Sequence, residues 1–233
     1  FFARDELRQQ LSIGSDASRA TYVLLSLLAV DFAFVFLHFL QLTDLINDTS
    51  FSLEGDRAYP ERFQYMKLLS IVILMLLVRK RADMIGFSAW SLLFFYLLID
   101  DAFQVHESLG GYVAASLGIS PALGLRAQDF GELIVSASAA IVLLGLIAVP
   151  YLRGSGAFRQ ASYHLFLLLL ALAFFGVFVD MLHVATDLGW KVSFVLGAME
   201  DGGEMIIVTI ITWYALLIFG RAGNRFESSK LAV

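Results

Sequence analysis

Six apolar segments, each long enough to cross a lipid bilayer, are the feature that most limits how this chain can fold. A membrane-spanning helix needs about 20 mainly apolar residues. The segments that meet this requirement are approximately 20–46, 63–80, 83–106, 129–152, 161–187 and 201–221. We therefore predict an all-α integral membrane protein, in which six transmembrane helices form a single polytopic domain over residues 1–233.

Composition supports a membrane protein and excludes several classes of function. Hydrophobic residues make up 59% of the chain and charged residues 16%, whereas a soluble domain carries roughly 25% charged residues. The net charge of −5 and the lack of a basic stripe argue against nucleic acid as a partner, and the expected partner is the lipid bilayer. Since the chain has no cysteine, disulfides and thiolate metal sites are excluded.

The charges between the apolar segments predict an orientation in the membrane. Acidic residues gather in the alternate connections, at Asp48, Glu54, Asp56, Glu107, Asp129, Glu200 and Asp201. Basic residues gather at the opposite ends of the segments, at Arg19, Arg79, Lys80, Arg153, Arg159 and Arg221. Because basic loops stay in the cytoplasm, we predict cytoplasmic N- and C-termini, an acidic outer face, and a location in a bacterial-type inner membrane.

Two similar motifs indicate an internal repeat. Residues 128–135 are QDFGELIV and residues 200–207 are EDGGEMII, and each copy opens a predicted span. Asp100 and Glu107 are seven residues apart upstream of the first copy, as are Asp180 and Asp187 upstream of the second. We therefore predict repeated helical hairpins at 83–152 and 161–221, related by an axis along the membrane normal. The segment 20–80 is an alternative third copy.

Acidic side chains form polar stripes near the outer ends of four predicted helices. With 3.6 residues per turn, positions three, four or seven apart share one helix face. The stripes are Asp100 with Gln104 and Glu107, Asp129 with Glu132 and Ser136, Asp180 with His183 and Asp187, and Glu200 with Glu204. An aspartate at the centre of a membrane helix costs about 2.5–3.5 kcal/mol or more. We therefore expect the stripes to face one another in a carboxylate-rich cluster open to the outside.

Too few basic residues lie on this side to neutralise the cluster, which favours a bound cation or shared protons. The D-x-x-H spacing of Asp180 and His183 lets one helix offer two ligands to one ion. The cluster offers the same kinds of ligand as the dinuclear metal sites of helical bundles, although its sequence motif is different. The predicted metal ligands are Asp100, Glu132, Asp180, His183 and Glu204, with His106, Glu107 and Glu200 as further candidates. Zinc, iron, manganese, copper and calcium are all compatible with oxygen and imidazole ligands.

These ligands predict a membrane metalloprotein, and one interpretation is a metal-dependent hydrolase or oxidoreductase that acts on a lipid-like or small substrate. Whether the chain is an enzyme stays open. The alternatives are a cation or proton pathway and an accessory subunit of a larger membrane complex, with a homo-oligomer also compatible. The almost wholly apolar inner halves of the last four spans favour a one-sided site over a channel.

Several of these residues also have a simpler structural interpretation. Asp129 and Asp201 begin predicted spans, where an acid can cap a helix N-terminus. Asp187 and Glu107 fit ordinary solvated loops. Asp31 and His38 either extend the site from the first span or form contacts of their own.

Overall fold

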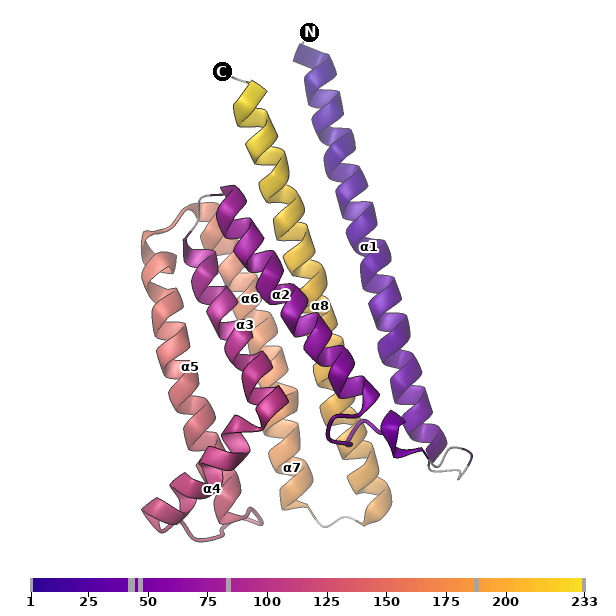
Figure 1. The fold of residues 1–233 in the computed structure, drawn as a ribbon, viewed down its shortest axis with the longest axis vertical. Helices are drawn as coiled ribbons and strands as arrows, with labels where there is room; N and C mark the ends of the chain where they lie inside the picture. The colour runs from indigo at the N-terminus through magenta and orange to yellow at the C-terminus, as the bar shows by residue number, and fades with distance from the viewer. Residues whose placement is uncertain (1, 42–44, 46–47, 83–84, 187–188, 232–233) are drawn as a thin grey trace.

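Helices form all the named elements in the part of the chain that the structure, a computed structural model, describes: residues 2–41, 45, 48–82, 85–186 and 189–231 (Figure 1). The elements are α1 (Phe2–Gln41), η1 (Thr49–Phe51), α2 (Tyr59–Ala82), α3 (Gly86–Phe103), α4 (Val105–Leu117), α5 (Ala127–Arg153), α6 (Gly156–Ala173), η2 (Phe174–Val179), α7 (Asp180–Ala185) and α8 (Trp190–Leu231). The predicted all-α class is confirmed. Asp187 lies outside the described residues.

Within the described residues, five helical stretches are long and apolar enough to cross a membrane: Ala17–Gln41, Gly86–Phe103, Ala127–Arg153, Gly156–Ala185 and Trp190–Gly223. The other predicted span, 63–80, lies in α2 and is not among them. Its charges are the reason, because Lys67 stands in the helix interior and Arg79 and Lys80 lie at its end. The chain therefore has helices suited to a membrane-embedded protein, but six crossings are not shown.

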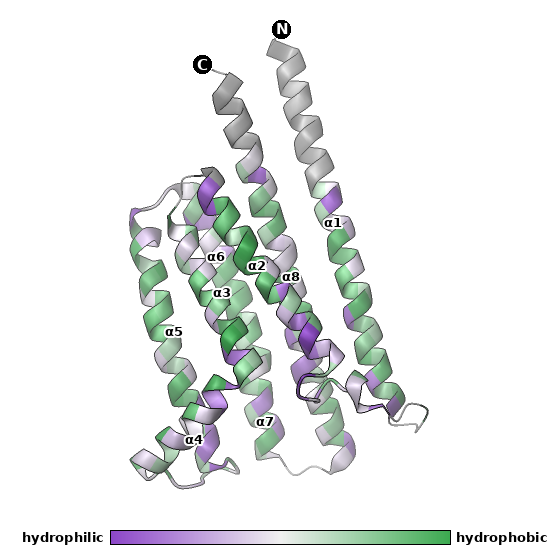
Figure 2. Cartoon of the chain, in the orientation of Figure 1, coloured by the Kyte–Doolittle hydropathy of each residue, from purple (hydrophilic) through white to green (hydrophobic). Residues whose placement is uncertain are grey.

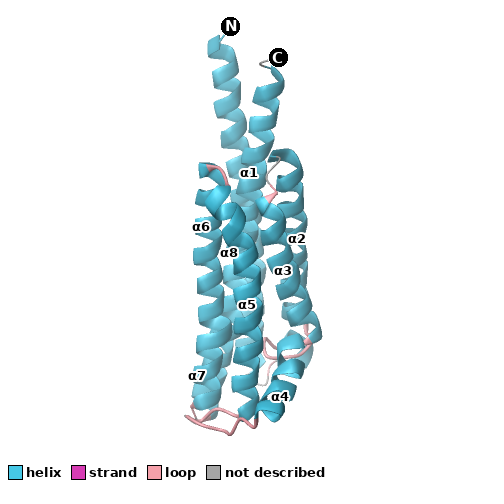
Figure 3. Ribbon diagram, turned by 90° about the vertical axis from the view of Figure 1, so that its left-hand side faces the viewer, coloured by secondary structure: helices cyan, strands magenta, loops and turns pink. Residues whose placement is uncertain are grey.

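The long helices run side by side along the long axis of the molecule (Figures 1 and 3). One end of this bundle carries α4, the first turns of α2, α5 and α8, and α7; we call it the α4 end. At the opposite end α1 and α8 extend beyond the other helices, and both chain termini lie there. Residues far apart in sequence, from α2 to α8, therefore meet at the α4 end.

The core of the bundle lies among α2, α3, α6 and α8. Its most buried large side chains are Ile71, Met75, Trp90, Phe94, Leu165 and Ile211. The indole Nε1 of Trp90 donates a hydrogen bond of 2.9 Å to Ser162 Oγ, which joins α3 to α6. Large apolar side chains are exposed on α1 and α5, for example at Phe32, Phe36, Ile141, Val142 and Leu152, as expected for lipid-facing surfaces.

The third predicted span is not one helix up to residue 106. Gln104 has a left-handed backbone, with φ of 50°, so that α3 ends at Phe103 and α4 begins in a new direction at Val105. The carboxylate of Asp100 accepts a hydrogen bond of 2.9 Å from the backbone N–H of His106, in the first turn of α4. Asp100 and Glu107 therefore do not share a helix face, and the predicted stripe through Gln104 is wrong.

The last helix begins earlier than predicted. It starts at Trp190 rather than near residue 201, because the mainly apolar segment before Glu200 continues the helix. Glu200 and Asp201 therefore lie about three turns inside α8, and the interpretation of Asp201 as an N-terminal cap is wrong. Glu200 and Glu204 remain one turn apart on the same helix, as the sequence predicts.

Two glycines bring α4 into close contact with α5. A Cβ atom on Gly131 would overlap the carbonyl oxygen of Gly110. A Cβ atom on Gly110 would lie 2.6 Å from the backbone nitrogen of Glu132. Only glycine fits such an approach, and the contact fixes the position of Glu132 at the α4 end.

Candidate functional site

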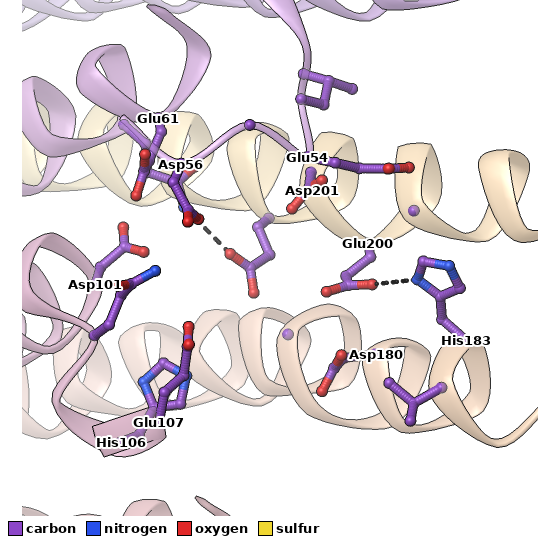
Figure 4. A pocket seen from close by; sticks show the side chains of 18 of the residues that line it. Glu54, Asp56, Glu61, Asp101, His106, Glu107, Asp180, His183, Glu200 and Asp201 are labelled. Atoms are coloured by element: carbon purple, nitrogen blue, oxygen red, sulfur yellow. Dashed lines mark hydrogen bonds and ion pairs between the residues drawn. The ribbon is translucent and has the colours of Figure 1, made fainter. Parts of the chain in front are cut away.

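A cavity of about 680 Å³ lies among the helices at the α4 end. Its wall is formed by α2, α3, α4, α5, η2, α7 and α8, with the segment between η1 and α2. Ten carboxylates line it: Glu54, Asp56, Glu61, Asp101, Glu107, Glu132, Asp180, Glu200, Asp201 and Glu204. Figure 4 shows labelled acidic side chains from several elements pointing into one space. Figure 2 shows hydrophilic residues at this end and at the opposite end of the bundle, with mainly apolar residues between them. We call this space the acidic cavity.

The structure places most of the residues singled out from sequence around the acidic cavity. Those that line it are His106, Glu107, Glu132, Asp180, His183, Glu200 and Glu204. Asp100 instead lies behind His106, with its Oδ2 atom 3.1 Å from His106 Nδ1. The sequence thus indicated the right end of the bundle and most of the side chains there.

Five lining carboxylates were missed as site residues: Glu54, Asp56, Glu61, Asp101 and Asp201. Glu54 and Asp56 precede α2 and belong to a connection that the charge pattern had already placed on the acidic side. Glu61 lies in the first turn of α2 and accepts hydrogen bonds from the Arg57 backbone and the Tyr65 hydroxyl. Their position in or beside the acidic connections was the signal that could have found them. How the connection before α2 folds over the cavity depends on tertiary structure and could not be predicted from sequence.

His106 is held by a carboxylate at the edge of the cavity. Its hydrogen bond with Asp100 raises the pKa of His106 above the ordinary value of 6.5, although partial burial acts in the opposite direction. Next to it, burial raises the pKa of Glu107, and the nearby Glu132 carboxylate acts in the same direction. Both groups lie in α4, beyond the end of the α3 span, and both retain protons more strongly than they would in water.

His183 has a hydrogen-bond partner on each ring nitrogen. Nδ1 lies 3.1 Å from Glu200 Oε2, and Nε2 lies 2.8 Å from Ser193 Oγ. The His183 and Glu200 side chains are 23% and 21% exposed, so this row of three groups is accessible from the surface. His183 comes from α7, whereas Ser193 and Glu200 lie two turns apart on α8.

Arg126 is the one lysine or arginine among the lining residues in the described part of the chain. Its NH2 and Nε atoms donate to Asp129 Oδ1 at 2.6 and 2.9 Å, and its backbone N–H donates to Asp129 Oδ2 at 2.7 Å. Asp129 thus closes the N-terminus of α5, which is the capping role considered from sequence. The guanidinium is therefore already paired with a carboxylate that does not line the cavity.

Glu204 reaches the cavity beside a distorted helix turn. The η2 segment is a π-helical turn, a feature that is frequent at functional sites. Within it Gly176 leaves no room for a Cβ atom, because Glu204 Oε1 occupies that space. Gln64 Nε2 donates to Glu204 Oε2 at 3.2 Å, whereas Gln64 Oε1 is buried without a hydrogen-bond partner.

Asp31 and His38 do not line the acidic cavity, and each has contacts of its own. Asp31 Oδ1 accepts from Lys67 Nζ at 2.8 Å, and Asp31 Oδ2 accepts from the Thr209 hydroxyl at 2.6 Å. Lys67 Nζ donates further to the Met205 carbonyl and to Thr209 Oγ1. His38 stacks on Phe194, with ring centroids 4.2 Å apart, and its Nδ1 accepts from the backbone N–H of Leu53.

The predicted metal site is wrong. Among the described residues, no group of three or more histidine, aspartate and glutamate side chains is arranged to hold a metal ion. The physical reason is that the candidate ligands surround a wide cavity and are engaged in pairs: His106 with Asp100, His183 with Glu200, Glu132 with Gln128 and Glu204 with Gln64. The interpretation as a metalloprotein or metal-dependent enzyme is therefore wrong.

Comparison with known proteins identifies the family of the chain. No curated protein and no solved structure matches the chain. A family profile described as a domain of unknown function, DUF8692, matches residues 20–219, which include every residue that lines the acidic cavity. The chain therefore belongs to the DUF8692 family.

Proposed function

We propose that the acidic cavity binds an organic cation that carries several amino groups, such as a linear polyamine, at the outer face of a membrane. The observation that carries this proposal is the charge of the cavity wall, where ten carboxylates face one arginine whose guanidinium is already bonded to Asp129. Clustered carboxylates repel one another and favour a bound positive charge or retained protons.

The size of the cavity supports a molecule rather than a single ion. Cavities of about 300–1,000 Å³ are typical of small-molecule sites, and this one is about 680 Å³. An ammonium group has three donors and no acceptor, so carboxylates spread around a cavity suit several separate amines. The buried Gln64 side chain, 8% exposed, keeps an acceptor oxygen without a partner beside Glu204 and offers one further bond to an N–H donor.

We infer that the chain crosses the membrane six times, with α2 as the sixth span. The interior charge of α2, on Lys67, is neutralised by Asp31, which lowers the cost of placing this helix in lipid. An even number of crossings also agrees with two termini at one end of the bundle (Figure 1). The arginines and lysines at that end favour cytoplasmic termini, an outward cavity and an inner-membrane location.

The repeat of helical hairpins, over 83–152 and 161–221 with 20–80 as a third copy, stays a prediction. Its support is the pair of motifs around Glu132 and Glu204, both of which line the acidic cavity. Association with a second copy or with a larger membrane complex also stays a prediction from sequence.

Calorimetric titration of the purified full-length protein with spermidine tests the proposed function. We expect saturable binding that weakens as ionic strength rises, since salt screens the carboxylates. Glu204→Gln and Asp180→Asn should each weaken binding by about tenfold, which corresponds to about 1.4 kcal/mol. The matched control is Asp48→Asn, an exposed acid outside the cavity, which should bind as the wild type does. Equal binding of 1,8-octanediol, or no loss in the cavity variants, would contradict the proposal.

A further inference from the structure

The contacts of His183 have the arrangement of a serine hydrolase triad. Ser193 Oγ lies 2.8 Å from His183 Nε2, and Glu200 Oε2 lies 3.1 Å from His183 Nδ1. A nucleophile within 2.6–3.2 Å of a base that is itself oriented by a third group is the geometric signature of nucleophilic catalysis. Such triads occur on unrelated folds and are recognised by geometry rather than by sequence order.

We propose that Ser193, His183 and Glu200 form a metal-independent catalytic triad that hydrolyses an acyl ester at the membrane surface. Glu200 accepts the Nδ1–H of His183, which leaves Nε2 as the base that faces the Ser193 hydroxyl. His183 and Glu200 also line the acidic cavity, whereas Ser193 is not among the described residues that line it. The inference is carried by the contacts of His183 and does not require a bound cation.

The reaction uses water as its one co-reactant. Ser193 Oγ attacks the ester carbonyl, its proton passes to His183 Nε2, and the carbonyl oxygen takes the negative charge. The bond to the leaving alkoxide breaks as that oxygen receives the proton from His183 Nε2, which leaves an acyl group on Ser193. Water then attacks this acyl group, gives a proton to His183, and releases a carboxylic acid as the proton returns to Ser193 Oγ.

The position of Ser193 in the first turn of α8 suits the negative charge of the intermediate. The first N–H groups of a helix lack partners within it and carry the positive end of the helix dipole. Val192 and Ser193 donate their N–H groups to the Gly189 carbonyl. The backbone N–H groups of Trp190 and Lys191 are therefore the first two of α8. The Lys191 side chain adds a positive charge at the same end.

Exposed apolar side chains around the triad indicate a substrate with an acyl chain. Leu182 on α7 is 42% exposed, and Trp190 and Val192 on α8 are 66% and 39% exposed. Tryptophan is enriched where a protein meets the membrane–water interface. An ester carbonyl of a lipid lies at this interface, whereas its acyl chain lies in the hydrocarbon, so the substrate class is a lipid-like acyl ester.

A fluorescent fluorophosphonate, which reacts covalently with activated serines, tests the triad without knowledge of the substrate. We expect the full-length protein in membranes to be labelled, Ser193→Ala to lose labelling, and His183→Ala to lose at least tenfold in labelling rate. The matched control, Ser108→Ala on the exposed face of α4, should be labelled like the wild type. An unlabelled wild type, or a labelled Ser193→Ala variant, would overturn the proposal.

A second measurement guards against variants that fail to fold. The chain has no cysteine, so Ser193→Cys creates a single thiol whose thiolate His183 can stabilise. Its alkylation by iodoacetamide at pH 7 should be at least tenfold faster than in Ser193→Cys with His183→Ala, and faster than in Ser108→Cys. Equal alkylation rates in all three variants would show that the hydrogen bond between Ser193 and His183 is purely structural. That result would overturn the proposed triad.

Discussion

At the residue scale, the acidic cavity depends on glycines that leave room for carboxylates. Gly176 lies against Glu204, and Gly197 lies against Glu54. Small residues near the acids allow close helix approach in general. Which acid each glycine faces depends on helix rotation, and a repeat motif such as EDGGEMII does not encode that rotation. The presence of glycines near the acids can therefore be read from sequence, whereas the acid that each glycine faces is seen only in the structure.

Replacing Gly176 with alanine should displace Glu204. An added methyl group would meet the end of the Glu204 side chain. The carboxylate would have to turn away and lose the hydrogen bond from Gln64, and such a bond contributes about 0.5–1.5 kcal/mol. We expect a lower thermal unfolding midpoint in detergent and weaker spermidine binding. Gly145→Ala is the matched control, because a Cβ atom there meets nothing within 4 Å, and it should leave stability unchanged or raise it. Similar behaviour of the two variants would argue against a positioning role for Gly176.

His106 should make the stability of the protein depend on pH. Because the hydrogen bond with Asp100 raises the His106 pKa in the folded state, the protonated form contributes stability below pH 6.5. That contribution is lost as pH rises through the raised pKa. We expect the difference in unfolding midpoint between wild type and His106→Gln to be largest near pH 5.5 and to shrink towards pH 8.5. Parallel curves for the two proteins would contradict this linkage.

At the scale of helices, the sequence predicts which segments are helical better than where they begin and end. Long apolar segments give α1, α3, α5, α6 and α8 because helix length and hydropathy are local properties. The break at Gln104 was missed because a left-handed glutamine carries no local signal of the kind that glycine gives. The early start of α8 was missed because the acids of the cavity resemble loop residues when their tertiary partners are unknown.

The buried pair of Lys67 and Asp31 should tie α1 to α2 and α8. Both side chains are at most 2% exposed, and removing one partner leaves an uncompensated buried charge that costs about 3–5 kcal/mol. We expect Lys67→Met and Asp31→Leu to lower the unfolding midpoint strongly when made singly. The double variant should recover most of the loss, since apolar replacements of a buried pair are often tolerated. A double variant whose loss equals the sum of the single losses would show that the pair is not coupled.

At the scale of the whole molecule, the prediction of a metal site was wrong because the types of residue at one end of the bundle do not determine how far apart they lie. The sequence predicted that acids from several helices would gather at one end, since lipid excludes them and their positions along the helices match. It does not encode the distances between them. A metal site needs ligands about 2.0–2.6 Å from one point, whereas these carboxylates surround a cavity of about 680 Å³. Metal binding and small-molecule binding require the same residue types, and the space between the side chains separates them.

The orientation of the whole bundle can be tested with single cysteines, because the chain contains none of its own. Asp48→Cys and Ser108→Cys place a thiol at exposed positions near the α4 end, and Gly156→Cys places one in open space at the opposite end. If the chain crosses six times with cytoplasmic termini, a membrane-impermeant maleimide should label the first two variants in intact cells. It should label the third only after the membrane is opened.

Labelling of residues 48 and 108 from opposite sides would show that α2 does not cross. Labelling of residue 156 alone in intact cells would place the acidic cavity on the cytoplasmic side, where the outward site proposed here could not operate.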